Sequence, residues 1–193
     1  MKKTEIDPAE IHENNIDIFN REIFLFQEID MGVAREFVKN FYILDRDKKP
    51  ITIHLQSEGG DWYSCMSIYD TIAHGLSHVK IICYGYVASA GTIILQAGDE
   101  RIAMPRCIFM IHEGSQEITG TYKQAQSNIA IDKESRDVML DIFTNRCKMA
   151  SFFNGKAASK VKTYIRTILN TKEDWYLNAN DAIKYGIIDS IYQ

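Results

Sequence analysis

Residues 79–98, VKIICYGYVASAGTIILQAG, are the stretch of sequence that decides the fold class. The segment 79–88 is mostly apolar, which is typical of a strand buried on both faces of a parallel sheet. The segment 89–98 predicts a short apolar helix that ends at Gly98. A buried strand that passes directly into a buried helix indicates an α/β protein.

The same alternation of strands and helices continues on both sides of this stretch. Upstream, strand-like segments at 22–29 and 51–57 alternate with helical patterns at 33–42 and 61–76, and Asp61 is the expected N-cap of the second helix. The elements expected downstream are strands at 101–104 and 107–112, a long amphipathic helix at 122–149, helices at about 156–168 and 179–185, and a last strand at 187–192. Asn178 and Gly186 flank the last helix as cap and stop. We predict an α/β fold with a largely parallel sheet, and the pattern alone leaves open whether it is doubly wound or a ββα spiral.

Composition narrows the class of protein. The chain has 193 residues, with 22 Lys and Arg against 26 Asp and Glu, so its net charge is −4. This mildly acidic balance argues against nucleic acid as the main partner. No apolar run reaches the roughly 20 residues that span a bilayer, and the segment MKKTEIDPAE (1–10) lacks the apolar stretch expected of a secretory signal. We expect a cytoplasmic protein with a flexible segment at 1–14 and one domain at 15–193.

Neither the cysteines nor the histidines predict a metal site. His74 and His78 are four residues apart on an expected helix but lack a third ligand. The spacing of the four cysteines matches no zinc knuckle or disulfide framework, and we expect buried free thiols at Cys65, Cys83, Cys107 and Cys147.

Ser89 is the first candidate for catalysis. It lies where a strand ends and a helix begins, so its hydroxyl is placed beside free backbone N–H groups at the positive end of the helix dipole. Those groups could stabilise the oxyanion that forms when the hydroxyl attacks a carbonyl. The alternative is that Ser89 is simply an N-cap.

Two further segments each allow a functional and a structural interpretation. The Gly59-Gly60 pair follows the 51–57 strand, where it could form a tight turn or offer a backbone N–H to an oxyanion. His112 ends the apolar segment 107–112, where it could be a core histidine or a general base for Ser89.

Taken together, these segments resemble one family. Ser-Glu-Gly-Gly (57–60), Gly-Tyr-Val-Ala-Ser-Ala-Gly (85–91) and Met-Ile-His (110–112) resemble the S-P-G-G, G-x-A-A-S-M-G and M-I-H-Q-P motifs of the Clp protease proteolytic subunit. They occur in the same order and at similar spacing. Further matches at 17–26, 67–72 and 182–189 extend the resemblance over roughly residues 15–193.

The resemblance implies a crotonase-like ββα spiral with a protruding strand–helix handle formed by residues 113–149. It implies that Ser89 is the nucleophile, that His112 is the general base, and that the N–H groups of Gly60 and Ala90 form the oxyanion hole. It also implies two stacked heptameric rings that enclose the active sites. An AAA+ unfoldase would consume ATP and feed unfolded polypeptides into the chamber, so the chain itself needs no cofactor.

The third member of the catalytic triad is where the chain departs from the family. The family aspartate falls on Asn170, which can orient His112 through its amide oxygen but brings no negative charge. Glu173 and Asp174 are rival third members, but Asp174 matches a different aspartate of the family and is a poor substitute. We therefore expect a serine endopeptidase of weak or conditional activity. The alternatives are a structural subunit that forms mixed rings with an active paralogue, or acyl-CoA chemistry on the same fold.

This departure leads to a prediction for Asn170→Asp. The charged acceptor stabilises the imidazolium that forms during catalysis, and the reverse exchange in a serine protease costs about 10⁴ in turnover. We expect peptidase activity of the assembled variant to rise several-fold or more in a fluorogenic peptide assay. Unchanged or reduced turnover would count against the placement of Asn170 in the triad.

Overall fold

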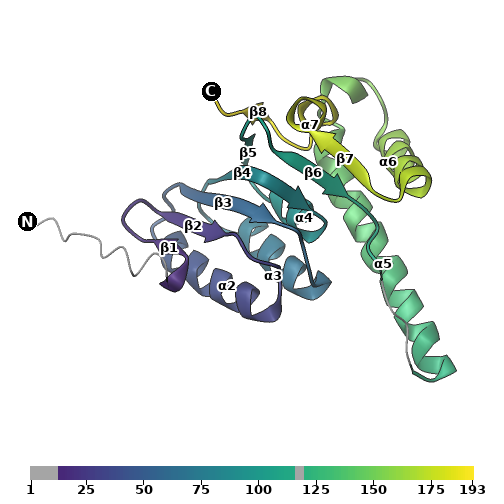
Figure 1. Cartoon of the computed structure of the whole chain (residues 1–193), viewed down its shortest axis with the longest axis horizontal. Coiled ribbons are helices and arrows are strands. Elements are labelled where there is room, and N and C mark those ends of the chain that lie inside the picture. Colours follow the sequence, from purple (N-terminus) through teal and green to yellow (C-terminus); the bar gives the residue numbers. More distant parts are fainter. Residues whose placement is uncertain (1–12, 116–119) are drawn as a thin grey trace, which may run out of the picture.

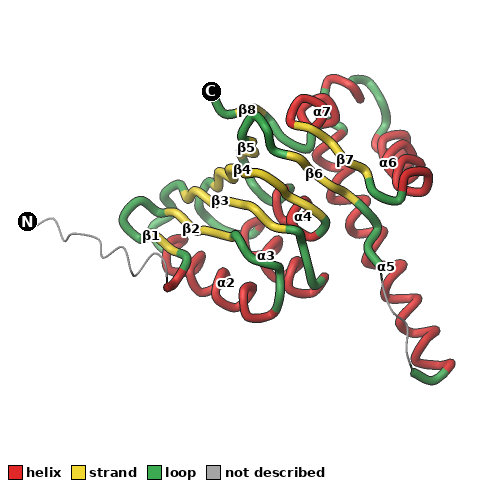
Figure 2. Tube along the Cα trace, viewed as in Figure 1, coloured by secondary structure: helices red, strands yellow, loops and turns green. Residues whose placement is uncertain are grey.

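One sheet of eight strands runs through the residues that this computed structural model describes, 13–115 and 120–193 (Figures 1 and 2). Its main path has the order β1-β2-β3-β4-β5-β8, while β6 pairs with β4 and β7 pairs with β6. All pairs are parallel except β1 with β2 and β6 with β7, so the expected largely parallel sheet is confirmed. The strands are β1 (Ile16–Asp17), β2 (Glu22–Leu25), β3 (Ile51–Ser57), β4 (Val79–Ala88), β5 (Glu100–Ala103), β6 (Ile108–Ile111), β7 (Trp175–Asn178) and β8 (Ser190–Ile191).

The helices divide between the face of the sheet and a projecting arm. In Figure 1, α2 and α3 lie side by side below the strands, and α5 extends well beyond the body of the molecule. The helices are α2 (Met31–Asp45), α3 (Trp62–Ala73), α4 (Ala90–Leu95), α5 (Tyr122–Cys147), α6 (Ala158–Lys172) and α7 (Ala179–Tyr185), with a 3-10 turn η1 (Ser151–Phe153). The bounds expected for β3 and β4 are confirmed, whereas α6 continues four residues beyond the expected end at 168.

Strand β4 changes its partner halfway along its length, and this fork positions the site. Residues 80–83 pair with β5, and residues 86–88 pair with β6. Gly85 lies between the two halves with φ +48, a conformation that an L side chain rarely adopts. The carboxyl end of β4, where Ser89 follows, is therefore placed beside the end of β6.

Local sequence signals set the ends of two helices as expected. Asp61 caps α3 by accepting a hydrogen bond from the Ser64 N–H at 2.8 Å. Asn178 caps α7 in the same way, and Gly186 ends that helix in the left-handed region with φ +78.

The four cysteines are free and buried, as expected. Burial raises the pKa of Cys107 and Cys147 to about 12, and it also raises the pKa of Cys65 and Cys83. A thiol that stays protonated at neutral pH is a poor nucleophile, so these side chains serve packing.

The arm α5 carries several apolar side chains that are exposed in the described part of the chain. Tyr122, Ile129 and Val138 are 78%, 54% and 41% exposed. Part of the strand expected in the handle, residues 116–119, lies outside the described residues, as does the expected flexible segment 1–14 apart from residues 13 and 14. Within the described ranges no helix is both long and apolar enough to span a membrane.

Asp45 provides a test of how the fold depends on pH. Its carboxylate accepts hydrogen bonds from the N–H groups of Leu76 at 2.9 Å and Ser77 at 2.7 Å, which holds the α3–β4 turn to the end of α2. Burial acts to raise the pKa of Asp45, but these hydrogen bonds outweigh it, and the net pKa lies below its ordinary value.

We expect Asp45→Asn to lower the free energy of unfolding by about 1 kcal/mol at pH 7, because hydrogen bonds to a charged acceptor are lost at a partly exposed site. A group with a lowered folded-state pKa stabilises above its unfolded pKa and loses that effect as the pH falls. The difference should therefore shrink below about pH 4. Denaturant unfolding at fixed protein concentration measures it, with Asp70→Asn on the exposed side of α3 as the matched control. Equal stabilities of the Asp45 variant and the parent at pH 7 would refute this role.

Candidate active site

Ser89 joins β4 to α4 in a strained backbone conformation. Its φ and ψ are 50° and −123°, and its side chain makes no capping hydrogen bond. The alternative that Ser89 is an ordinary N-cap is therefore wrong. Such backbone geometry costs about 1–3 kcal/mol and persists only where the surroundings hold it in place.

Hydrogen bonds on both sides of Ser89 hold this conformation. The Ser89 N–H donates to the Met110 carbonyl at 2.9 Å. The Ser89 carbonyl accepts from the Thr92 N–H at 2.9 Å and from the Thr92 hydroxyl at 2.7 Å. Because Thr92 is fully buried, these bonds fix the serine rigidly at the start of α4.

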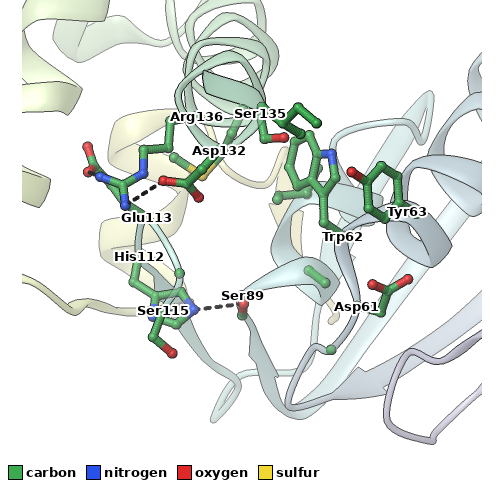
Figure 3. A pocket seen from close by; sticks show the side chains of 16 residues that line it. Asp61, Trp62, Tyr63, Ser89, His112, Glu113, Ser115, Asp132, Ser135 and Arg136 are labelled. Carbon is green, nitrogen blue, oxygen red and sulfur yellow. Dashed lines mark hydrogen bonds and ion pairs between the residues drawn. The ribbon is translucent and has the colours of Figure 1, made fainter. Parts of the chain in front are cut away.

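The Ser89 hydroxyl lies within hydrogen-bond distance of an imidazole. Ser89 Oγ and His112 Nε2 are 2.8 Å apart (Figure 3). The parallel pairing of Ala88 with Met110 explains the contact, since it brings the residues that follow each strand to the same edge of the sheet. The structure thus brings together two residues that lie 23 positions apart in the sequence.

The second ring nitrogen of His112 faces a carboxylate. His112 Nδ1 lies 3.5 Å from Asp174 Oδ1. Strands β6 and β7 are antiparallel with Ile111 opposite Trp175, so the next pair along the ladder is His112 with Asp174. Asn170 lies in the last turn of α6 with its side chain exposed, and within the described part of the chain that side chain makes no hydrogen bond. Its orienting role stays a prediction.

The two proposed oxyanion donors are free to act. A bridge to Ile29 uses the Gly59 carbonyl and the Asp61 N–H, each at 2.7 Å, and leaves the Gly60 N–H pointing elsewhere. Ala90 is the first residue of α4, where an N–H has no partner within the helix. Over residues 13–115 and 120–193, neither N–H donates a hydrogen bond, and both residues line the same cavity as Ser89.

Gly59 permits this arrangement. Its φ is +104°, and a Cβ at this position would come within 2.7 Å of the Ser89 Cβ. Any other residue would push the turn away from the serine. The Gly59-Gly60 pair therefore forms a tight turn and also leaves the Gly60 N–H available as a donor. The two interpretations that the sequence left open are compatible.

The cavity beside Ser89 has a volume of about 290 Å³ and is lined by side chains from α3, α4 and α5. Trp62 enters from α3, while Asp132, Ser135 and Arg136 enter from α5 (Figure 3). Ile93 of α4 and Met139 of α5 complete the apolar part of the lining. Sequence reasoning missed the α5 residues, although their spacing of three and four positions places them on one helical face.

An ion-pair network connects α5 to the segment that follows His112. Arg136 Nη1 lies 3.1 Å from Glu113 Oε2, and Arg136 Nη2 lies 2.9 Å from Asp132 Oδ2. Glu113, the residue that follows His112, is thereby held against α5 at one wall of the cavity.

Comparisons with known proteins identify the family of the chain and its fold. A family model described as Clp protease matches residues 12–193. The chain is similar to "ATP-dependent Clp protease proteolytic subunit 2" of Prochlorococcus marinus (strain MIT 9312), with 33% identity over 95% of this chain and 89% of that protein. It is 32% identical to subunit 3 of Synechococcus sp. (strain CC9902), over 95% of this chain and 90% of that protein. A solved mutant of ClpP1 from Listeria monocytogenes covers 91% of this chain and 93% of its own, with a TM-score of 0.73 and 23% identity. That likeness confirms the expected fold.

The backbone strain at Ser89 can be measured by comparing the stabilities of two variants at this position. We expect Ser89→Gly to be more stable than Ser89→Ala by about 1 kcal/mol, because only glycine adopts a positive φ without cost. Thermal unfolding at one protein concentration measures this difference. On the exposed side of α3, Ser67→Gly should instead be less stable than Ser67→Ala, because glycine weakens a helix. The same order at both positions would contradict the strained geometry.

Proposed function

The chain belongs to the Clp protease family, and we propose that Ser89 is its nucleophile and His112 its general base. As a Clp protease proteolytic subunit it is a serine endopeptidase, so its reaction is attack of a serine hydroxyl on a peptide carbonyl carbon. The observation that carries the assignment is the 2.8 Å separation of Ser89 Oγ and His112 Nε2.

The proton path follows from this contact. Unprotonated Nε2 of His112 accepts the hydroxyl proton as Ser89 Oγ bonds to the carbonyl carbon. The carbonyl oxygen takes up the negative charge, and the N–H groups of Gly60 and Ala90 stabilise it. His112 then gives its proton to the leaving amine, and a water molecule releases the acyl group from Ser89 by the reverse sequence.

Two residues compete for the role beside His112 Nδ1. We assign the orienting carboxylate of this chain to Asp174, which the β6–β7 register holds opposite His112. Its carboxylate is 43% exposed and 3.5 Å from the ring, so solvent weakens its effect on the imidazolium. Asn170 occupies the family's aspartate position but brings no charge. Together these features support a peptidase of limited activity in its present sequence.

We also propose that the chain assembles with copies of itself into two stacked heptameric rings. Support comes from the uncovered apolar side chains of α5, such as Ile129 and Val138. In such an assembly α5 packs against its counterpart from the opposite ring, and the active sites face an enclosed chamber.

The proposed partner is an AAA+ unfoldase that consumes ATP and delivers unfolded polypeptides. Relatives named ATP-dependent Clp protease proteolytic subunits support this arrangement. The chain itself then needs no cofactor, because hydrolysis uses only its own side chains and backbone. We place the complex in the cytoplasm, without nucleic acid or membrane as a partner.

Covalent labelling with a fluorophosphonate tests the proposed nucleophile. We expect the probe to modify Ser89 of the full-length assembled protein, as located by peptide mass spectrometry. His112→Gln should slow labelling at least 100-fold, because a general base contributes about 10²–10⁴. Asp174→Asn should slow it about tenfold, equivalent to about 1.4 kcal/mol.

The matched control is Asp181→Asn, because Asp181 lies in α7, where its carboxylate accepts a hydrogen bond from the cap residue Asn178 and lines no part of the cavity. Its labelling rate should equal that of the parent. Assembled protein that carries no label at Ser89 would contradict the catalytic assignment and favour a structural subunit of mixed rings.

A further inference from the structure

The wall of the cavity opposite Ser89 is acidic. Figure 3 shows Asp132 and Ser135 on α5 facing the space above Ser89 and His112. Three carboxylates line the cavity, those of Asp61, Glu113 and Asp132, against one guanidinium, that of Arg136. The lining therefore carries net negative charge at the place where a substrate side chain would lie.

Arg136 does not offer its charge to a substrate. Its two terminal nitrogens pair with Glu113 at 3.1 Å and with Asp132 at 2.9 Å. A guanidinium held by two carboxylates has little remaining attraction for an anion. The ion pair with Arg136 also fixes the Asp132 side chain in place. Burial acts to raise the pKa of Asp61, but hydrogen bonds from Ser64 and neighbouring N–H groups outweigh it, so that Asp61 is also ionised.

Two acceptors on α5 remain available. Arg136 occupies Oδ2 of Asp132, and in the described ranges Oδ1 has no partner. Ser135 lies three residues further along the helix, on the same face. Its hydroxyl makes no hydrogen bond within those ranges, whereas the hydroxyl of Ser127 on the same helix donates to the Lys123 carbonyl. The Asp132 side chain is only 20% exposed, so a bound cation would replace little water and gain a strong attraction.

Next to this polar wall, part of the cavity is apolar. Trp62, Ile93 and Met139 line it, and Ile93 and Met139 are buried. A long basic side chain fits a cavity with one apolar and one acidic wall. Its methylene groups pack on the apolar surface, while its charged head stays with the polar groups. The indole of Trp62 adds a favourable face for a cation. An apolar side chain would instead cover Asp132 and Ser135 without satisfying them.

We propose that this cavity selects lysine or arginine at the substrate position whose carbonyl Ser89 attacks, with Asp132 as the residue that determines specificity. The inference rests on the proposed function, since it assumes that Ser89 is the nucleophile. The enzyme then cleaves peptide bonds on the carboxyl side of basic residues.

Peptidyl diphenyl phosphonates test this selectivity without requiring turnover. Ser89 Oγ bonds to phosphorus, His112 accepts the hydroxyl proton, and one phenolate leaves and is protonated to phenol. Three reagents that differ only in the first side chain, matching lysine, methionine or glutamate, are compared on the full-length assembled protein. We expect the lysine reagent to modify Ser89 at least tenfold faster than the methionine reagent, and the glutamate reagent to be slowest.

Variants then locate the source of the selectivity. Asp132→Asn should lower the lysine-to-methionine rate ratio about tenfold, and Ser135→Lys, which puts a cation on the same wall, should lower it at least as far. Asp141→Asn is the matched control, because this exposed aspartate of α5 pairs with Lys162 away from the cavity. Its ratio should equal that of the parent.

The outcomes separate the two proposals. If the fluorophosphonate labels Ser89 but the lysine reagent is no faster than the methionine reagent, the selectivity is overturned and the nucleophile stands. An unchanged ratio in both Asp132→Asn and Ser135→Lys also overturns it. If neither the fluorophosphonate nor any phosphonate modifies Ser89, the proposed function fails, and the selectivity fails with it.

Discussion

The double pairing of β6 is the constraint on which the site depends. This short strand runs parallel to β4 on one side and antiparallel to β7 on the other. The first pairing brings Ser89 to Nε2 of His112, and the second brings Asp174 to Nδ1. Because side chains alternate between the faces of a sheet, a slip of one residue in either pairing would turn a partner away from the imidazole. The geometry of the site is therefore a property of strand register more than of any single side chain.

The same register maintains the backbone strain at Ser89, the proposed nucleophile. The Met110 carbonyl, on β6, accepts the Ser89 N–H, and buried Thr92 binds the Ser89 carbonyl from within α4. These bonds hold Ser89 at a positive φ, and Gly59 leaves the space that this conformation needs. The hydroxyl is thus presented to the cavity beside the N–H groups of Gly60 and Ala90, the proposed donors to a substrate oxyanion. The strained backbone, the proposed oxyanion donors and the imidazole therefore lie together at the end of β4.

The bounds of single strands and the caps of single helices were predictable from local sequence. The contacts between elements that are distant in the sequence were not, because they depend on strand register and helix placement. The bounds of β3 and β4 follow from apolar runs that end at turn signals, and the caps Asp61 and Asn178 act within three residues of their own positions. The contact of Asp174 with His112 was not predictable in this way, because it depends on β7, a strand that the pattern did not indicate, and on its register with β6. Family resemblance pointed instead to Asn170. Likewise, the acidic wall of the cavity arises only when α5 is placed over Ser89, which no local pattern specifies.

The most direct test of the central claim is a crystal structure of the assembled protein after modification of Ser89 by a phosphonate. The account predicts continuous density from Ser89 Oγ to phosphorus, with His112 Nε2 within hydrogen-bond distance of the adduct. It also predicts that the phosphonyl oxygen accepts hydrogen bonds from the N–H groups of Gly60 and Ala90 at about 2.7–3.1 Å. A structure in which Ser89 and His112 lie apart in every subunit, or in which that oxygen faces away from both N–H groups, would contradict it.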